Sequence, residues 1–286
     1  MKKYLQNLLT VWGNLTNSAV KYQRGNRVTK VETTSDTAIQ NLGSAALTNA
    51  RGTSPILLVC EHASRKIPLE FEGLGLTPDA QISHVAWDPG AFEMAAHMAR
   101  ILNAKLVTST VSRLVYDCNR PPESPGAMPS KSEVFDIPGN QTLTDAQRAD
   151  RVLRFYRPFQ SLLSKTIAAT ETKPVLVTLH SFTPVYQGAR RDVEIGILHD
   201  TDARLADQML TIAAKHTPLN VQRNSPYGPQ DGVTHTLKEH GIENGLMNVM
   251  IEVRNDLIAT VAAQHAMGQM LADLITEAMQ KTGAAA

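Results

Sequence analysis

The sequence lacks several features that would assign its class at once. It holds two cysteines, Cys60 and Cys118, in 286 residues, so we expect no disulfide framework and a reducing compartment. Basic and acidic residues are interspersed and nearly balanced, with a net charge of +1, which argues against a nucleic-acid partner. No run reaches the roughly 18 apolar residues of a membrane helix, and no signal-peptide core follows Met1. These absences predict a cytoplasmic protein without a membrane partner.

The first 53 residues differ in character from the rest of the chain. Residues 1–53 are rich in Thr, Asn, Ser and Gln and lack sustained periodicity. We predict that they form a poorly ordered or peripheral extension, in which residues 4–15 could fold as a short amphipathic helix. From Ser54 onward, short apolar runs alternate with helical patterns, so residues 54–286 are predicted to form one domain.

Short apolar runs bounded by polar residues are typical of strands buried on both faces. We predict such strands at 55–60, 106–108, 114–116, 175–179, 193–198 and 249–253. Apolar residues at helical spacing lie between them, at 90–102, 144–167, 205–212 and 257–280. Thr144 and Gln147 have capping-box spacing, and Pro158 is expected to bend the helix that they open. Strands that alternate with helices predict a doubly wound α/β sheet.

Two histidines stand at carboxyl ends of predicted strands, where such folds bind their ligands. His62 follows the strand at 55–60, and His180 follows the strand at 175–179. Neutral imidazole is the commonest metal ligand, and a catalytic zinc site needs three protein ligands. Each histidine could instead cap the end of a strand or form a hydrogen bond to a loop. Asp88, which could also be a helix N-cap, is a candidate third ligand.

Charged residues also stand at these strand ends. Glu252 lies inside an apolar strand, where a carboxylate is costly unless it is paired or used. It could be the general base beside a metal-bound water, or it could form an ion pair with Arg254 or another arginine. Arginine captures carboxylates in bidentate geometry. Each arginine near a predicted strand end could form a structural ion pair, but as a group they suggest a small anionic substrate. They are Arg113, Arg120, Arg190, Arg191 and Arg254.

Seven ordered segments within residues 54–276 resemble the N-formylglutamate amidohydrolase family, whose fold is similar to that of zinc carboxypeptidases. The segments are Cys60–Ser64 with Ile67-Pro68, His84–Gly90, Ser112–Arg120, Leu179–Pro184, Asn224–Tyr227, His240-Gly241 and Ile251–Asp256. The resemblance implies a three-layer α/β/α fold of the zinc-exopeptidase type, with a mostly parallel or mixed central sheet.

The resemblance also implies roles for individual residues. His62 and His180 look like zinc ligands, and Glu252 looks like the general base. Asn119 and Arg120 look like the pair that holds a substrate carboxylate. Further residues that the resemblance would place at the substrate are Arg113, Tyr227, His240 and Arg254. Carboxypeptidases have a ligand glutamate three residues after the first histidine. In this chain that position is Arg65, so Asp88 is our preferred third ligand and Glu61 the alternative.

The sequence therefore predicts a metal-dependent amidohydrolase for an N-formyl or N-acyl amino acid. The resemblance implies N-formyl-L-glutamate as substrate, a place in histidine degradation, and a divalent metal, Zn²⁺, as cofactor. Two alternatives stay open. The chain could be a non-catalytic α/β binding protein for anionic metabolites, or a metal-independent hydrolase that uses Glu252 and His180 as an acid–base pair. The oligomeric state is not predicted.

Overall fold

The structure is a computed structural model that describes residues 40, 41 and 43–283; the helix predicted at 4–15 lies outside these residues. The strands are β1 (Gln40–Asn41), β2 (Ala45–Thr48), β3 (Ile56–Cys60), β4 (Lys105–Ser109), β5 (Lys131–Ser132), β6 (Phe135–Asp136), β7 (Val175–Phe182), β8 (Val185–Tyr186), β9 (Ala189–Arg190), β10 (Ile195–Leu198), β11 (Val221–Arg223) and β12 (Asn248–Arg254).

The α-helices are α1 (Pro78–Ile82), α2 (Ala91–Ile101), α3 (Pro138–Gln141), α4 (Asp145–Arg151), α5 (Arg157–Ala168), α6 (Arg204–His216) and α7 (Val261–Thr282). The π-helical turns are Val152–Tyr156 and Leu237–Gly241. The 3-10 turns are Leu69–Gly75, Pro125–Ala127, Pro229–Asp231, Ile242–Asn244 and Asn255–Ile258. Within the described residues, no helix is both long enough and apolar enough to cross a membrane.

A mixed sheet of eight strands forms the centre of the domain, in the order β1-β2-β4-β3-β7-β12-β10-β11. The four central strands, β4, β3, β7 and β12, are parallel to one another. β2 is antiparallel to β4, and β10 is antiparallel to β12. Because the carboxyl ends of β3, β7 and β12 meet at one edge, residues that follow or end these strands come together there.

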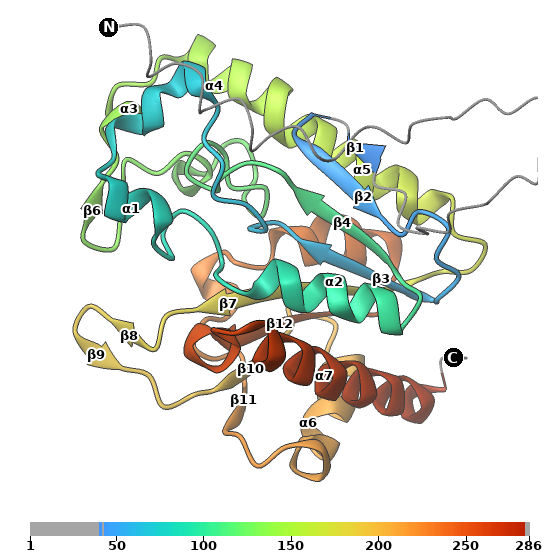
Figure 1. The fold of residues 1–286 in the computed structure, drawn as a ribbon. Helices are drawn as coiled ribbons and strands as arrows, with labels where there is room; N and C mark the ends of the chain where they lie inside the picture. The colour runs from blue at the N-terminus through green and yellow to red at the C-terminus, as the bar shows by residue number, and fades with distance from the viewer. Residues whose placement is uncertain (1–39, 42, 284–286) are drawn as a thin grey trace, which may run out of the picture. The chain divides into compact units, whose positions relative to one another are not determined.

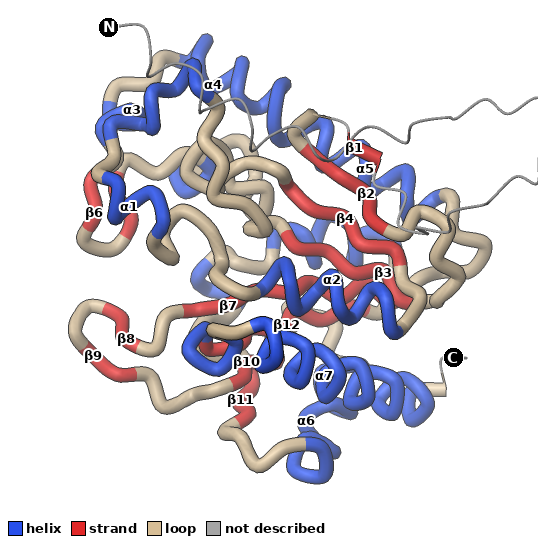
Figure 2. The backbone as a smooth tube through the Cα atoms, viewed as in Figure 1, coloured by secondary structure: helices blue, strands red, loops and turns tan. Residues whose placement is uncertain are grey.

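Helices cover both faces of this sheet (Figure 1), which confirms the expected three-layer α/β/α fold. On one face, α2, α6 and α7 pack against side chains such as Leu58 and Ile251. On the other face, α5 and the loop after β4 pack against Leu57 and Val59. Figure 2 shows the strands enclosed between helices, with α2 and α7 side by side. Neighbouring residues of β3 enter opposite cores, which explains its unbroken apolar run.

The apolar runs locate the central strands correctly. Predicted strands at 55–60, 106–108, 175–179, 193–198 and 249–253 correspond to β3, β4, β7, β10 and β12. The prediction at 114–116 is wrong, because this run is a turn in the loop after β4. Leu114, Val115 and Tyr116 are buried in the same core cluster as residues of α5. Their apolar character therefore reflects core burial without strand pairing.

The edges of the sheet differ most from the prediction. β2, which falls within the predicted extension, pairs with β4 over Ala45–Thr48. β11 pairs with β10 through a short, partly polar segment, Val221–Arg223. Neither segment has the long apolar run of a central strand, because an edge strand has fewer neighbours to pack against. The folded domain therefore begins before Ser54.

The long helix after the surface loop begins as predicted and is interrupted near the predicted proline. The side chains of Thr144 and Gln147 form a capping box with each other's backbone N–H groups. The π-helical turn Val152–Tyr156 follows α4, and Pro158 stands in the first turn of α5. Proline lacks an N–H, so it cannot continue the regular hydrogen-bond pattern.

The contribution of the α5 core can be measured with one substitution at two positions. Leu163 on α5 is fully buried, whereas Leu153 on the preceding π-helical turn is 68% exposed. We expect Leu163→Ala to lower the free energy of unfolding by about 2–5 kcal/mol, because it leaves a cavity. Leu153→Ala should change it by less than about 0.5 kcal/mol. Urea denaturation measures both, and equal effects would contradict this packing.

Candidate active site

The central strands bring His62, His180 and Glu252 to one edge of the sheet. His62 lies two residues beyond the end of β3, and His180 lies near the end of β7. Glu252, on β12, is the direct partner of His180 in the parallel β7–β12 pair. The three side chains are nearly inaccessible to solvent.

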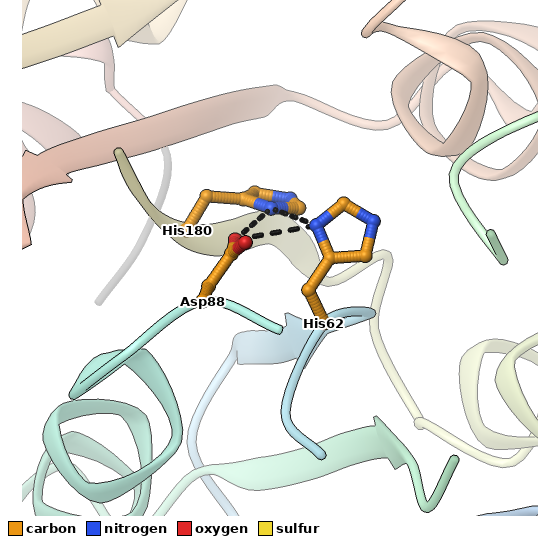
Figure 3. A group of neighbouring side chains, drawn as sticks. All are labelled: His62, Asp88 and His180. Atoms are coloured by element: carbon orange, nitrogen blue, oxygen red, sulfur yellow. Dashed lines mark hydrogen bonds and ion pairs between the residues drawn. The ribbon is translucent and has the colours of Figure 1, made fainter. Parts of the chain in front are cut away.

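The two histidines and Asp88 converge on one point, as Figure 3 shows. The Nδ1 atoms of His62 and His180 are 3.2 Å apart. Asp88 Oδ2 lies 3.2 Å from the first and 3.0 Å from the second. Ligand atoms of a tetrahedral zinc ion, at about 2.0–2.1 Å from the metal, lie about 3.3 Å from one another. The three atoms therefore have the spacing of a metal site.

Backbone contacts fix Asp88 between the two histidines. The Asp88 N–H donates to the carbonyl oxygen of His62 over 3.0 Å. The N–H of Ser181, next to His180, donates to Asp88 Oδ2 over 3.2 Å. Gly90 then turns the chain into α2 with φ 79°, and a Cβ there would meet the Ile258 carbonyl oxygen at 2.6 Å. This turn requires glycine. It brings Asp88 next to His62, although the two residues are 26 positions apart in the sequence.

A carboxylate lies at the outer nitrogen of each imidazole. His62 Nε2 is 2.7 Å from Asp117 Oδ1, and His180 Nε2 is 3.2 Å from Glu61 Oε2. Arg113 in turn contacts Asp117 at 2.8 Å and Asp88 at 3.5 Å. The hydrogen bond to Asp117 holds the Nε2–H tautomer of His62 and leaves its Nδ1 lone pair for a metal. Glu61, the alternative third ligand, therefore lies behind His180, and Asp88 is the carboxylate that faces both inner nitrogens.

The charge of the site also fits a divalent cation. Four buried carboxylates meet here, those of Glu61, Asp88, Asp117 and Glu252, and Arg113 is the guanidinium that contacts two of them. Without a metal, burial and the charge of Arg113 act against protonation of His62, but Asp117 and Asp88 outweigh them and raise its pKa. The Nδ1 atoms of His62 and His180 are 3.2 Å apart, so they cannot both carry a hydrogen that points at the other. Protonation of the histidines alone therefore compensates the negative charge of the carboxylates poorly.

Of these four carboxylates, Glu252 is the one that forms no hydrogen bond or ion pair with a histidine among the described residues. Burial, together with the repulsion of Asp88, raises the pKa of Glu252 to about 7, although the positive charges of His180, His62 and Arg113 act to lower it. Its Oε2 has no hydrogen-bond partner among the described residues. A carboxylate whose pKa lies near neutrality can both accept and return a proton during a reaction. These properties suit a general base.

The site opens into a cavity of about 190 Å³. Its lining includes the three predicted ligands, Glu252, Arg113, Asn119, Arg120 and Tyr227. The Asn119 amide is engaged at both ends, since it donates to the Val233 carbonyl and accepts from the Thr236 N–H. Arg120 contacts the backbone carbonyls of Gly232 and Asn119, and it has no carboxylate partner among the described residues.

Two residues that the resemblance placed at the substrate do not line this cavity. His240 is buried near Ser164, 3.5 Å from its hydroxyl. Arg254 is held by the carboxylates of Glu194 and Asp256, at 3.2 and 2.8 Å, and by nearby backbone carbonyls. These ion pairs direct its guanidinium away from the site. The structural alternative that the sequence left open for Arg254 is therefore correct, with partners other than Glu252.

The fold and the site together define the class of this protein as a three-layer α/β/α hydrolase with a His-Asp-His centre. The chain belongs to the N-formylglutamate amidohydrolase family, whose model matches residues 54–259. It is therefore an enzyme that acts on an amide bond. This result favours the predicted amidohydrolase over the non-catalytic binding protein.

Solved structures support the fold. The crystal structure of a gene product from Agrobacterium tumefaciens is 53% identical, with a TM-score of 0.81 over 83% of this chain and 95% of that chain. An N-formylglutamate amidohydrolase from Ralstonia eutropha is 16% identical, with a TM-score of 0.56 over 83% of this chain and 99% of that chain. No curated protein matches the chain at a significant level.

Asp117 is the one partner in the site to which the sequence assigned no role. We expect Asp117→Asn to weaken binding of a divalent metal by about 10- to 100-fold, because the imidazole of His62 loses the carboxylate that orients it. A competition titration against a chromophoric chelator measures this affinity. Asp273→Asn, at an exposed position of α7, is the matched control and should leave it unchanged. Equal affinities of the two variants would contradict the role of Asp117.

Proposed function

We propose that this enzyme hydrolyses the amide of an N-formyl or N-acyl amino acid with a divalent metal, Zn²⁺, as cofactor. The observation that carries the proposal is the convergence of the two Nδ1 atoms and Asp88 Oδ2 within 3.0–3.2 Å of one another. The site lies beside a buried glutamate and opens into the cavity. His62, His180 and Asp88 would hold the metal. When bound, it supplies Lewis acidity that polarises the scissile carbonyl and lowers the pKa of a water.

Glu252 performs the proton transfers of the reaction. It accepts a proton from the attacking water and passes it to the nitrogen of the leaving amino acid, so that water and the amide give a carboxylic acid and a free amine. The pKa of about 7 suits both directions of transfer. Its position beside His180 on the neighbouring strand fixes it next to the ligands. Rigid strands therefore hold the base and one ligand in constant register.

Arg120 is the residue best placed to take a carboxylate of the substrate. It lines the cavity, and its hydrogen bonds go to neutral carbonyl groups. Arg113 also lines the cavity, but it is already paired with Asp88 and Asp117. A guanidinium without a carboxylate partner favours a negatively charged ligand. N-formyl-L-glutamate, which has such a carboxylate, is the substrate that we propose.

A formate-release assay tests the proposal. The purified chain should hydrolyse N-formyl-L-glutamate faster than N-acetyl-L-glutamate or the N-formyl compound in which the carboxylates are amidated. Dialysis against a chelator should abolish activity, and stoichiometric Zn²⁺ should restore it. Activity that survives metal removal would instead support the metal-independent acid–base pair. No turnover of any N-acyl amino acid by metal-loaded protein would contradict the proposed function.

The role of Glu252 is tested by Glu252→Gln, which keeps the shape of the side chain and removes its basicity. We expect turnover to fall by about 10²–10⁴-fold, while metal content stays unchanged because Glu252 is not a ligand. Steady-state kinetics and elemental analysis of the same preparation measure the two properties. Glu243→Gln, at an exposed position, serves as control. Near-normal turnover of Glu252→Gln would exclude it as the base.

A further inference from the structure

A glycine allows the segment that carries Tyr227 to approach the catalytic base. Gly196 on β10 is the direct partner of Glu252 in the antiparallel β10–β12 pair, and directly opposed residues project to the same face of a sheet. The Ser225 carbonyl oxygen lies only 2.0 Å from the place where a Cβ of Gly196 would be. The Ser225-Pro226-Tyr227 segment therefore crosses the sheet beside Glu252. His180, Glu252 and this segment form one row over neighbouring strands.

The hydroxyl of Tyr227 has a donor partner and no acceptor partner. Its oxygen accepts a hydrogen bond from Arg191 Nη2 over 2.9 Å. Its own hydrogen has no acceptor among the described residues, and the side chain lines the cavity together with Glu252. The Tyr227 ring packs against the cluster formed by Leu198, Val233, Leu237 and Met250. The hydroxyl is thus held in position, with its hydrogen available to a molecule in the cavity.

Arg191 is fixed by aromatic rings that form one wall of the cavity. Its guanidinium lies 4.6 Å from the Tyr186 ring centre, 4.8 Å from that of Tyr227 and 5.5 Å from that of Phe182. These distances are within the range of cation–π contacts. Arg191 also donates to the Thr183 carbonyl, and it has no carboxylate partner among the described residues. Its contacts join the segment 182–186 to Tyr227.

We propose that the Tyr227 hydroxyl donates a hydrogen bond to the carbonyl oxygen of the scissile amide as that oxygen becomes negatively charged, and that Arg191 is the positioning residue that orients this hydroxyl. The inference rests on the proposed function, since it assigns a role in the same hydrolysis. No covalent bond to Tyr227 forms or breaks. Its hydrogen bond strengthens as charge develops, which lowers the barrier of the chemical step.

The position of Tyr227 favours the reacting oxygen over the substrate carboxylate. Its segment lies beside Glu252, whereas the guanidinium of Arg120 is held by the carbonyl oxygens of Asn119 and Gly232. Burial, and then the negative charge of Glu252, raise the pKa of Tyr227. The hydroxyl therefore keeps its proton at neutral pH and remains a hydrogen-bond donor. Arg191 polarises the O–H bond further by donating to the same oxygen.

Tyr227→Phe separates the two possible roles, because it removes the hydroxyl and keeps the ring that packs against Arg191. With N-formyl-L-glutamate and Zn²⁺-loaded enzyme, we expect kcat to fall on the order of 100-fold while KM changes little. A rise in KM with unchanged kcat would show that the hydroxyl binds a ground-state group and would overturn the inference, as would unchanged kinetics. Thermal unfolding of both proteins checks that the fold is retained.

A double-mutant cycle tests whether Arg191 acts through Tyr227. Arg191→Met should lower kcat about tenfold, and Arg191→Met in the Tyr227→Phe background should cause no further loss. Arg190→Met, at the exposed neighbouring position on β9, makes the same change of charge and should leave kcat unchanged. Effects of the two substitutions that multiply, or an equal loss in Arg190→Met, would overturn the role of Arg191.

The same assay distinguishes failure of this inference from failure of the proposed function. If wild-type enzyme with Zn²⁺ releases formate and Tyr227→Phe matches it, only the role of Tyr227 is overturned. If wild-type enzyme with Zn²⁺ hydrolyses no N-acyl amino acid, both the proposed function and this inference are overturned.

Discussion

The structure depends on one electrostatic constraint, the convergence of two imidazole lone pairs and a carboxylate oxygen at a buried point. Burial of unpaired charge is costly, so the surroundings of His62, His180 and Asp88 must compensate for it. Asp117 and Glu61 lie at the outer nitrogens of the two histidines, and Arg113 joins two of the carboxylates. This arrangement leaves the three inner atoms facing one another at the spacing of metal ligands, which is the basis of the proposed metal site.

At the edge of the sheet where the site lies, the two faces carry different kinds of side chain. On one face, apolar side chains of β3, β7 and β12 pack under α2, α6 and α7 and fix the strands. On the other, the row of His180, Glu252 and Gly196 crosses three adjacent strands. Gly196 ends the row with an empty position that the Ser225 carbonyl fills. One strand therefore carries His180, the next carries Glu252, and the third admits the segment of Tyr227.

Sequence patterns predict the parts of this arrangement that depend on local chemistry. Long apolar runs locate β3, β7 and β12, and with them His62, His180 and Glu252, because central strands are buried on both faces. Short edge strands such as β2 lack that signal. The apolar run at 114–116 misleads because it is buried in a loop. Asp117 and the choice of Asp88 over Glu61 depend on contacts between segments that are distant in sequence, and spacing alone does not reveal such contacts.

The central claim is that these three side chains hold one catalytic metal ion. An anomalous difference map at the zinc absorption edge, from crystals of enzyme reconstituted with Zn²⁺ and shown to be active, tests it most directly. We predict one peak per chain, within bonding distance of His62 Nδ1, His180 Nδ1 and Asp88 Oδ2. Active crystals with no peak at this point, or with the metal bound elsewhere, would contradict the claim.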